Sequence, residues 1–212
     1  MSNSKENPNS FTVSAFLDRN GHFASQCDPQ TLAAGVEGQT PILFWLGCSD
    51  SRVPEGLVIR AGLGEVFVHR NVANLFTPGD TSALAAVAYA INVLKVPHIA
   101  VVGHENCGGC AAGLAAATAP APTEPTSCVG MQAIQKWIEP IRQLALAELQ
   151  KDEKTDLSRV VTANVVAQVA NLADNPVIKD AWGRGQSVCV YGWVYDLATG
   201  KINDLNVTRT GN

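Results

Sequence analysis

The chain has 212 residues, a length that suits a single α/β domain. Lysine and arginine number 15 against 19 acidic residues, so the formal net charge is −4 and no basic surface for nucleic acid is expected. Charged residues make up 16% of the chain, below the ~25% of a typical soluble domain, which indicates surface covered by another subunit. No apolar stretch reaches the ~18 residues of a membrane span, and the polar N-terminus shows no signal peptide, so we expect a cytoplasmic protein that does not bind membranes.

The hydrophobic pattern predicts a helical arm followed by alternating strands and helices. Residues 1–10 are predicted to form a disordered tail and residues 11–37 a helical arm. Short apolar runs predict buried strands at 42–47, 65–69, 98–103 and 188–195, the last of which turns into an antiparallel partner at 201–207. Helical spacing predicts helices over 82–94, with Asp80 as N-cap, and over 110–117, 131–151 and 157–172.

Strands that alternate with helices predict an α/β fold. We expect one domain over residues 1–212, built on a central, mostly parallel sheet flanked by helices, with about four parallel strands and an antiparallel edge strand. In such sheets the functional site lies at the carboxyl ends of the strands. Two polar clusters follow predicted strands at that edge, namely residues 48–52 and residues 104–107.

The two polar clusters contain candidate metal ligands. His104 and Cys107 are three residues apart in a strand-to-helix loop, so one loop offers an imidazole and a thiolate to one ion, and Cys48 provides a third ligand if the two strand ends lie side by side. Two thiolates and an imidazole are zinc ligands by softness and geometry. Cys110 leaves two alternatives open: a non-catalytic module with a closed structural zinc site of three cysteines and His104, or a thiol redox protein that uses the Cys107–Cys110 pair.

Asp50 and Arg52 favour a catalytic zinc site over a structural one. Positions i and i+2 of an extended turn face the same side, and a guanidinium pairs with a carboxylate through two parallel hydrogen bonds. If Arg52 holds Asp50, the fourth zinc position stays open for water, as in catalytic zinc sites. If it does not, Asp50 is a candidate fourth ligand that closes the site.

Three segments together resemble the motifs of the β-class carbonic anhydrases: CSDSR at 48–52, VHRN at 68–71 and GHENCGG at 103–109. The segment YGWVYD at 191–196 is similar to a late strand of the same family. The resemblance implies one zinc ion per chain, bound by Cys48, His104 and Cys107, with Asp50 and Arg52 as the catalytic dyad. It implies reversible hydration of carbon dioxide to bicarbonate and a proton by zinc-bound hydroxide, in an obligate homodimer that is often built up to a tetramer.

The resemblance also implies residues that contact substrate. The positions that line the carbon dioxide pocket in this family are Gln39, Phe67, Val72, Tyr89 and Gly108, of which Gln39, Phe67 and Tyr89 come across the dimer interface. Trp45, Arg70 and Tyr195 occupy positions linked to bicarbonate inhibition in a subclass where the aspartate closes on zinc. Gln39 and Tyr89 together favour the open subclass. Cys110 departs from the family pattern, and no ligand is expected there.

The ligand set predicts how activity depends on pH. Zn²⁺ with two thiolates and a neutral imidazole carries no net charge, whereas three imidazoles leave a charge of +2. The bound water is therefore less acidified than the pKa of ~7 typical of a three-histidine site. We expect carbon dioxide hydration, measured by stopped flow, to rise toward alkaline pH. A rate that stays flat between about pH 6 and 9 would contradict the charge argument.

Overall fold

The computed structural model describes residues 12–120 and 126–211. The chain separates into two compact units, one that ends at Gln39 and one over Thr40–Asn212. The predicted tail at 1–10 and part of the proline-rich connection lie outside the described residues.

The first unit consists of two helices that expose their apolar side chains. α1 spans Ser14–Gln26 and α2 spans Pro29–Glu37, which confirms the predicted helical arm. The Asp28 carboxylate accepts a hydrogen bond from the Thr31 amide and caps α2, and Pro29 occupies its first turn. Neither helix buries a residue within this chain. The large apolar side chains left exposed are Val13, Phe16, Leu17, Phe23, Leu32 and Val36.

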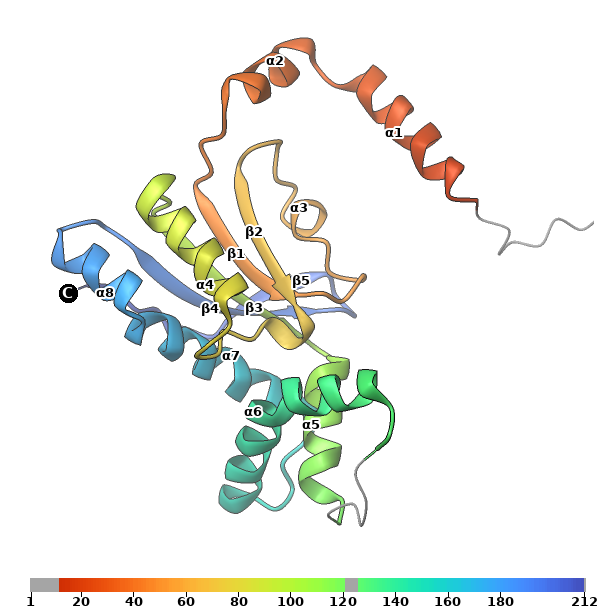
Figure 1. The fold of residues 1–212 in the computed structure, drawn as a ribbon, viewed down its shortest axis with the longest axis vertical. Coiled ribbons are helices and arrows are strands. Elements are labelled where there is room, and N and C mark those ends of the chain that lie inside the picture. Colours follow the sequence, from red (N-terminus) through yellow and green to blue (C-terminus); the bar gives the residue numbers. More distant parts are fainter. Residues whose placement is uncertain (1–11, 121–125, 212) are drawn as a thin grey trace, which may run out of the picture. The chain divides into compact units, whose positions relative to one another are not determined.

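The second unit is built on a five-stranded sheet in the order β2-β1-β3-β4-β5 (Figure 1). Its strands are β1 (Leu43–Cys48), β2 (Val66–Asn71), β3 (His98–His104), β4 (Cys189–Asp196) and β5 (Lys201–Asp204). The first four strands are parallel to one another, and β5 is antiparallel to β4. This sheet confirms the predicted α/β class and the antiparallel edge strand.

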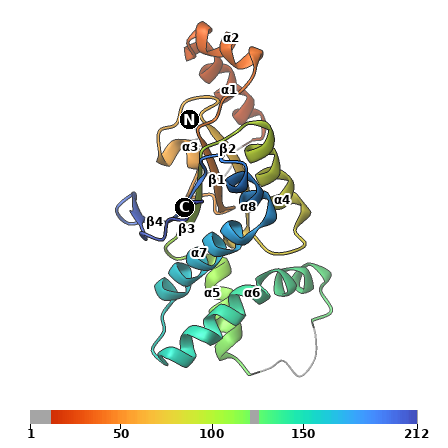
Figure 2. The same cartoon turned by 90° about the vertical axis from the view of Figure 1, so that its left-hand side faces the viewer.

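Helices cover one face of the sheet and extend beyond its carboxyl edge (Figures 1 and 2). They are α4 (Thr81–Ala88), α5 (Gly108–Thr118), α6 (Val129–Lys151), α7 (Leu157–Asp174) and α8 (Pro176–Gly183). The Asp80 carboxylate accepts hydrogen bonds from the Ser82 and Ala83 amides, which confirms the predicted N-cap of α4. The predicted 82–94 helix continues past Ala88 as a π-helical turn, η2 (Tyr89–Val93).

Three short helical segments were not expected from the sequence. α3 (Glu55–Val58) and the single turn η1 (Val72–Asn74) are too short to produce a helical hydrophobic period. α8 does carry a start signal, because Asn175 caps it and Pro176 occupies its first turn.

Alternation along the strands divides the core between the two faces of the sheet. Phe44 and Leu46 of β1 lie in the larger cluster, together with side chains of α4, α7 and α8, whereas Trp45 lies in a smaller cluster on the opposite face, near α3. α7 packs so closely against β3 that a Cβ at Gly103 would come within 2.6 Å of Val165 Cγ2. This close approach lies directly before His104, the last residue of β3.

Candidate metal centre

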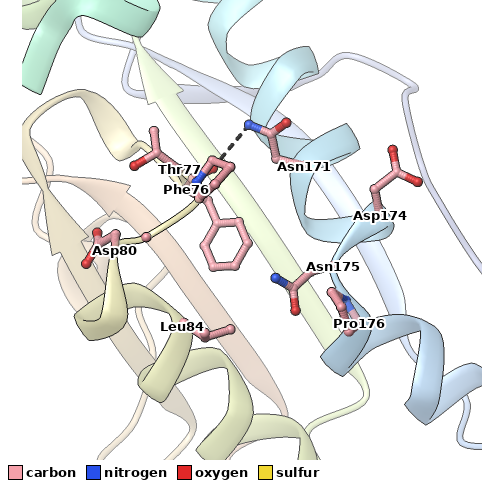
Figure 3. A pocket seen from close by; sticks show the side chains of 10 residues that line it. Phe76, Thr77, Asp80, Leu84, Asn171, Asp174, Asn175 and Pro176 are labelled. Atoms are coloured by element: carbon pink, nitrogen blue, oxygen red, sulfur yellow. Dashed lines mark hydrogen bonds between the residues drawn. The ribbon is translucent and has the colours of Figure 1, made fainter.

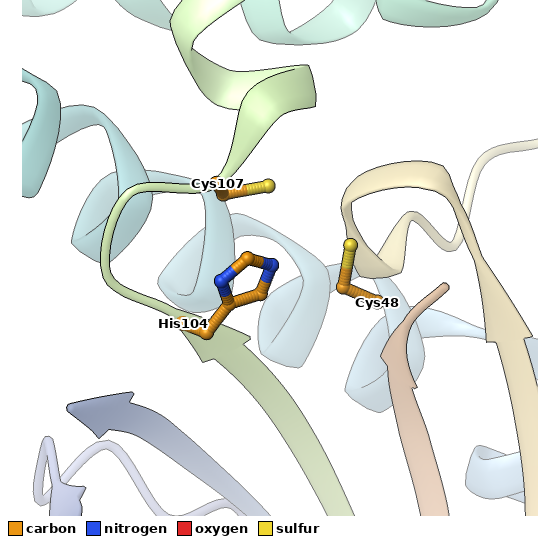
Figure 4. Close-up of side chains that lie close together, drawn as sticks. All are labelled: Cys48, His104 and Cys107. Atoms are coloured by element: carbon orange, nitrogen blue, oxygen red, sulfur yellow. The ribbon is translucent and has the colours of Figure 1, made fainter. Parts of the chain in front are cut away.

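Cys48, His104 and Cys107 converge at the carboxyl edge of the sheet (Figure 4). Cys48 ends β1, His104 ends the neighbouring strand β3, and Cys107 is the N-cap residue of α5. One ligand atom from each residue lies within 4.8 Å of the other two, and all three residues are buried. The parallel pairing of β1 with β3 is what brings the two sequence clusters together.

The hydrogen bonding of His104 leaves one ring nitrogen free for a metal. Nδ1 lies 2.9 Å from the carbonyl oxygen of Glu105, and because a carbonyl only accepts, Nδ1 carries the proton. Nε2 is buried and has no hydrogen-bond partner among the described residues. A buried imidazole nitrogen without a partner, beside two thiols, fits the tetrahedral preference of zinc for nitrogen and sulfur ligands.

The thiolate forms of the two cysteines are unfavourable in the absence of a cation. The hydrogen bond with Cys107, followed by burial, raises the pKa of Cys48 to about 12, and the hydrogen bond with Cys110 is the main cause that raises the pKa of Cys107 to about 11. Burial lowers the pKa of His104, but the nearby Cys48 sulfur favours the protonated imidazole more strongly and leaves the pKa raised. Binding of a cation therefore displaces protons from this cluster.

Arg52 holds Asp50 beside the cluster. Arg52 Nε and Nη2 donate to the two carboxylate oxygens over 2.9 and 2.7 Å, and the Arg52 amide donates to Oδ1 over 2.9 Å. Nη2 also donates to the Asn106 carbonyl and so links the two polar loops. The hydrogen bond from Arg52 is the main cause that lowers the pKa of Asp50 well below its ordinary value. Asp50 Oδ2 lies 3.7 Å from His104 Nε2, adjacent to the cluster but engaged by Arg52.

Arg70 donates hydrogen bonds to the main chain at Cys48, a metal ligand, and at Asp50, which pairs with Arg52. Its Nε donates to the Cys48 carbonyl over 2.8 Å, its Nη2 donates to the Asp50 carbonyl over 2.6 Å, and its Nη1 pairs with Glu55 over 3.2 Å. Arg70 is thus bound to the loop that follows β1. Trp45 and Tyr195, which the resemblance grouped with Arg70, instead lie in the smaller apolar cluster. This anchoring role of Arg70 was not predictable from the sequence, because two of the three acceptors are main-chain carbonyls, which no side-chain pattern reveals.

The residues expected to line a carbon dioxide pocket differ in their contacts, their exposure and the elements that carry them. The Phe67 and Tyr89 rings stack with their centroids 5.8 Å apart, and Tyr89 and Val72 are about half exposed. Gly108 begins α5, directly after the ligand Cys107. Gln39 is the last residue of the arm unit.

Cys110 is buried one helical turn after Cys107 but is not part of the ligand cluster. Its Sγ lies 4.0 Å from Asn164 Nδ2 of α7. The closed site of three cysteines and one histidine is therefore not favoured.

Comparison with known proteins identifies the family. The carbonic anhydrase family profile matches residues 43–202. The carbonic anhydrase of Emericella nidulans is 34% identical over 87% of this chain and 78% of its own length, and that of Pseudomonas aeruginosa is 35% identical over 79% of this chain and 74% of its own. The chain belongs to the β-carbonic anhydrase family. Family membership and the ligand set together identify zinc as the cofactor of this protein.

Solved structures of this family share the fold. The β-carbonic anhydrase of Coccomyxa, solved in complex with acetazolamide, superposes with a TM-score of 0.84 at 32% identity, covering 94% of this chain and 89% of the other. A tetrameric β-carbonic anhydrase of Sordaria macrospora superposes with a TM-score of 0.78 at 32% identity, covering 93% and 96%. Within residues 12–120 and 126–211, no helix is long and apolar enough to cross a membrane.

Zinc content distinguishes the three-ligand site from the closed four-ligand alternative. We expect Cys107→Ser to lose most of its zinc, because it replaces a thiolate ligand with a poorly coordinating hydroxyl. Cys110→Ser, equally buried and three residues away, serves as the matched control and retains one zinc per chain by elemental analysis. Loss of zinc from Cys110→Ser as well would establish Cys110 as a fourth ligand.

Proposed function

We propose that this protein catalyses the reversible hydration of carbon dioxide to bicarbonate and a proton, as a zinc lyase. The observation that carries the proposal is the buried cluster of Cys48, His104 and Cys107 with the Asp50–Arg52 pair beside it. When bound by these three residues, zinc acts as a Lewis acid that lowers the pKa of water and makes hydroxide available as the nucleophile. A closed structural zinc site or a thiol pair would leave Asp50 and Arg52 without a role.

Asp50 orients the attacking oxygen. Its lowered pKa keeps the carboxylate ionised throughout the working pH range, so it accepts a hydrogen bond from the nucleophile's O–H and directs a lone pair toward carbon dioxide. Arg52 donates a hydrogen bond to each carboxylate oxygen, so both oxygens are engaged even though Oδ2 lies only 3.7 Å from His104 Nε2. This pairing supports the open form of the site, in which Asp50 is not a ligand.

The start of α5 stabilises the charge that develops on the substrate. The first amide groups of a helix have no intrahelical acceptor and point toward anions. Gly108 is the first residue of α5, and a Cβ placed on it would meet no atom of the described residues within 4 Å apart from its chain neighbours and the backbone of its own helix. We assign its N–H group to the oxygen of the forming bicarbonate.

Apolar side chains receive the uncharged substrate. Phe67, Val72 and Tyr89 provide apolar surface, and we propose that Gln39, Phe67 and Tyr89 reach the site of a second copy of the chain. Trp45, Arg70 and Tyr195 stay a hypothetical bicarbonate-inhibition site. Their use as such would require Arg70 to leave Cys48, Asp50 and Glu55.

Self-association follows from the exposed apolar surface. We propose a homodimer that pairs into a tetramer, as the Sordaria relatives are tetrameric. The arm exposes a set of large apolar side chains that a second copy would bury. We further propose that the arm and the sheet unit act as one catalytic domain over residues 1–212. None of the six cysteines, all of which lie in the described part of the chain, forms a disulfide, which supports action in the reducing cytoplasm.

Substitution of Asp50 tests the mechanism. We expect Asp50→Ala to keep one zinc per chain and to lose about 10²–10⁴-fold in kcat, the range for a positioned proton-handling group. Asp180→Ala, which removes an exposed carboxylate of α8, is the control and keeps full activity. Stopped-flow hydration assays and elemental analysis give both quantities. A metal-free Asp50→Ala protein would make Asp50 a ligand and refute the open site.

Substitution in α1 tests the arm as an oligomer contact. Leu17 is 72% exposed in the single chain, so a buried position in the assembly predicts that Leu17→Asp weakens self-association by about tenfold or more. Asn20→Asp adds the same charge to a polar position of α1 and should leave the assembly intact. Sedimentation velocity measures the two variants. Equal behaviour of both variants would exclude α1 from the interface.

A further inference from the structure

Residues 72–76, which follow β2, form a loop that adopts an unfavourable backbone conformation beside the metal centre. Ala73 and Asn74 have φ values of 64° and 46°, in the left-handed region that non-glycine residues rarely adopt. Such a conformation persists only where the surroundings determine it fully, and it is concentrated at functional sites. The contacts of this loop therefore indicate what it does.

Side chains hold the backbone of this loop from several directions. Asn71 exchanges two hydrogen bonds of 2.7 Å with the main chain of Leu75. From α7, Asn164 donates to the Ala73 carbonyl over 2.9 Å and Gln168 accepts from the Phe76 amide over 2.9 Å. Asn171 donates to the Phe76 carbonyl beside a surface pocket (Figure 3). The loop is thus fixed at both ends by buried or partly buried amide side chains.

One peptide group in this loop makes a hydrogen bond through its oxygen and another through its N–H group. The Val72 carbonyl accepts a hydrogen bond from Trp137 Nε1 of α6 over 2.8 Å. The N–H group of the same peptide, which belongs to Ala73, donates to Cys48 Sγ over 3.4 Å. A Cβ at Gly109 would come within 2.9 Å of Ala73 Cβ, so the start of α5 leaves this peptide little room to shift.

We propose that Trp137 is a positioning residue for the zinc centre, acting through the Val72–Ala73 peptide on the thiolate of Cys48. The indole N–H polarises the peptide it binds, which strengthens the donation of the peptide N–H to sulfur. A hydrogen bond to a ligand sulfur withdraws electron density from the metal and orients the ligand. The contact thereby offsets part of the charge that two thiolates deliver to zinc. The inference rests on the proposed function only in requiring a metal ion at Cys48.

A second tryptophan provides a matched comparison. Trp182 Nε1 of α8 also donates to a main-chain carbonyl, that of Val188, over 2.8 Å. Both indoles are partly buried and both pack against the larger core cluster. Only the peptide bound by Trp137 continues to a metal ligand. Replacement of each tryptophan by phenylalanine removes the same kind of hydrogen bond and leaves an aromatic ring in place.

The experiment compares Trp137→Phe and Trp182→Phe after zinc is replaced by cobalt. We expect Trp137→Phe to bind one cobalt per chain and to move the sulfur-to-cobalt charge-transfer band to longer wavelength, because a thiolate with a weaker hydrogen bond is more easily oxidised. Chelator competition should show a loss of zinc affinity of about tenfold. Trp182→Phe should change neither quantity. An unchanged band in Trp137→Phe, or an equal shift in both variants, would overturn the proposal.

A measurement on the wild-type protein covers the case in which Trp137→Phe fails to fold. In the cadmium-loaded protein, a hydrogen bond from the Ala73 amide to Cys48 Sγ transmits a scalar coupling between the metal nucleus and that amide proton. Absence of the coupling refutes the contact. Failure of the proposed function gives a different result, namely a wild-type protein that binds metal but does not hydrate carbon dioxide.

Discussion

The metal centre depends on the close approach of two buried thiols and one imidazole. A neutral imidazole brings no charge that would compensate two thiolates. Their ligand atoms lie within 4.8 Å of one another, and the raised pKa values of Cys48 and Cys107 express how unfavourable two thiolates would be there. A divalent cation converts this into a favourable arrangement because it neutralises both thiolates. The sheet makes the approach unavoidable, since β1 and β3 are paired in parallel and end side by side.

Two arginines organise the surroundings of the cluster in different ways. Arg52 engages a side chain, the carboxylate of Asp50, and therefore determines which group is available to the substrate. Arg70 engages main-chain carbonyls and therefore determines where Cys48 and Asp50 lie. Because guanidinium groups stay charged at any working pH, neither contact changes with acidity in the range where the enzyme functions.

The sequence was sufficient for those parts of the fold and site that local patterns encode. The apolar runs predicted the parallel strands and Asp80 predicted the start of α4. The positions of Cys48, His104 and Cys107 after strands made them candidate ligands, and the family resemblance selected them over a site that includes Cys110. The left-handed turn at Ala73 was not predictable, because it is imposed by amides of α7 some ninety positions away along the chain. The resemblance linked Arg70 to bicarbonate inhibition. Its hydrogen bonds to main-chain carbonyls were not predictable, because every residue has such a carbonyl and the sequence therefore carries no sign of them.

The exposed arm has a consequence for how the protein behaves on dilution. Helices α1 and α2 bury no residue within their own chain, and in the proposed homodimer a second copy stabilises their ordering. Folding of this segment is then linked by mass action to the concentration of protomers. In the proposed homodimer, Gln39 reaches the neighbouring site, and dissociation would therefore remove a pocket wall as well as an apolar contact. Catalytic competence in such an enzyme is a property of the assembled pair.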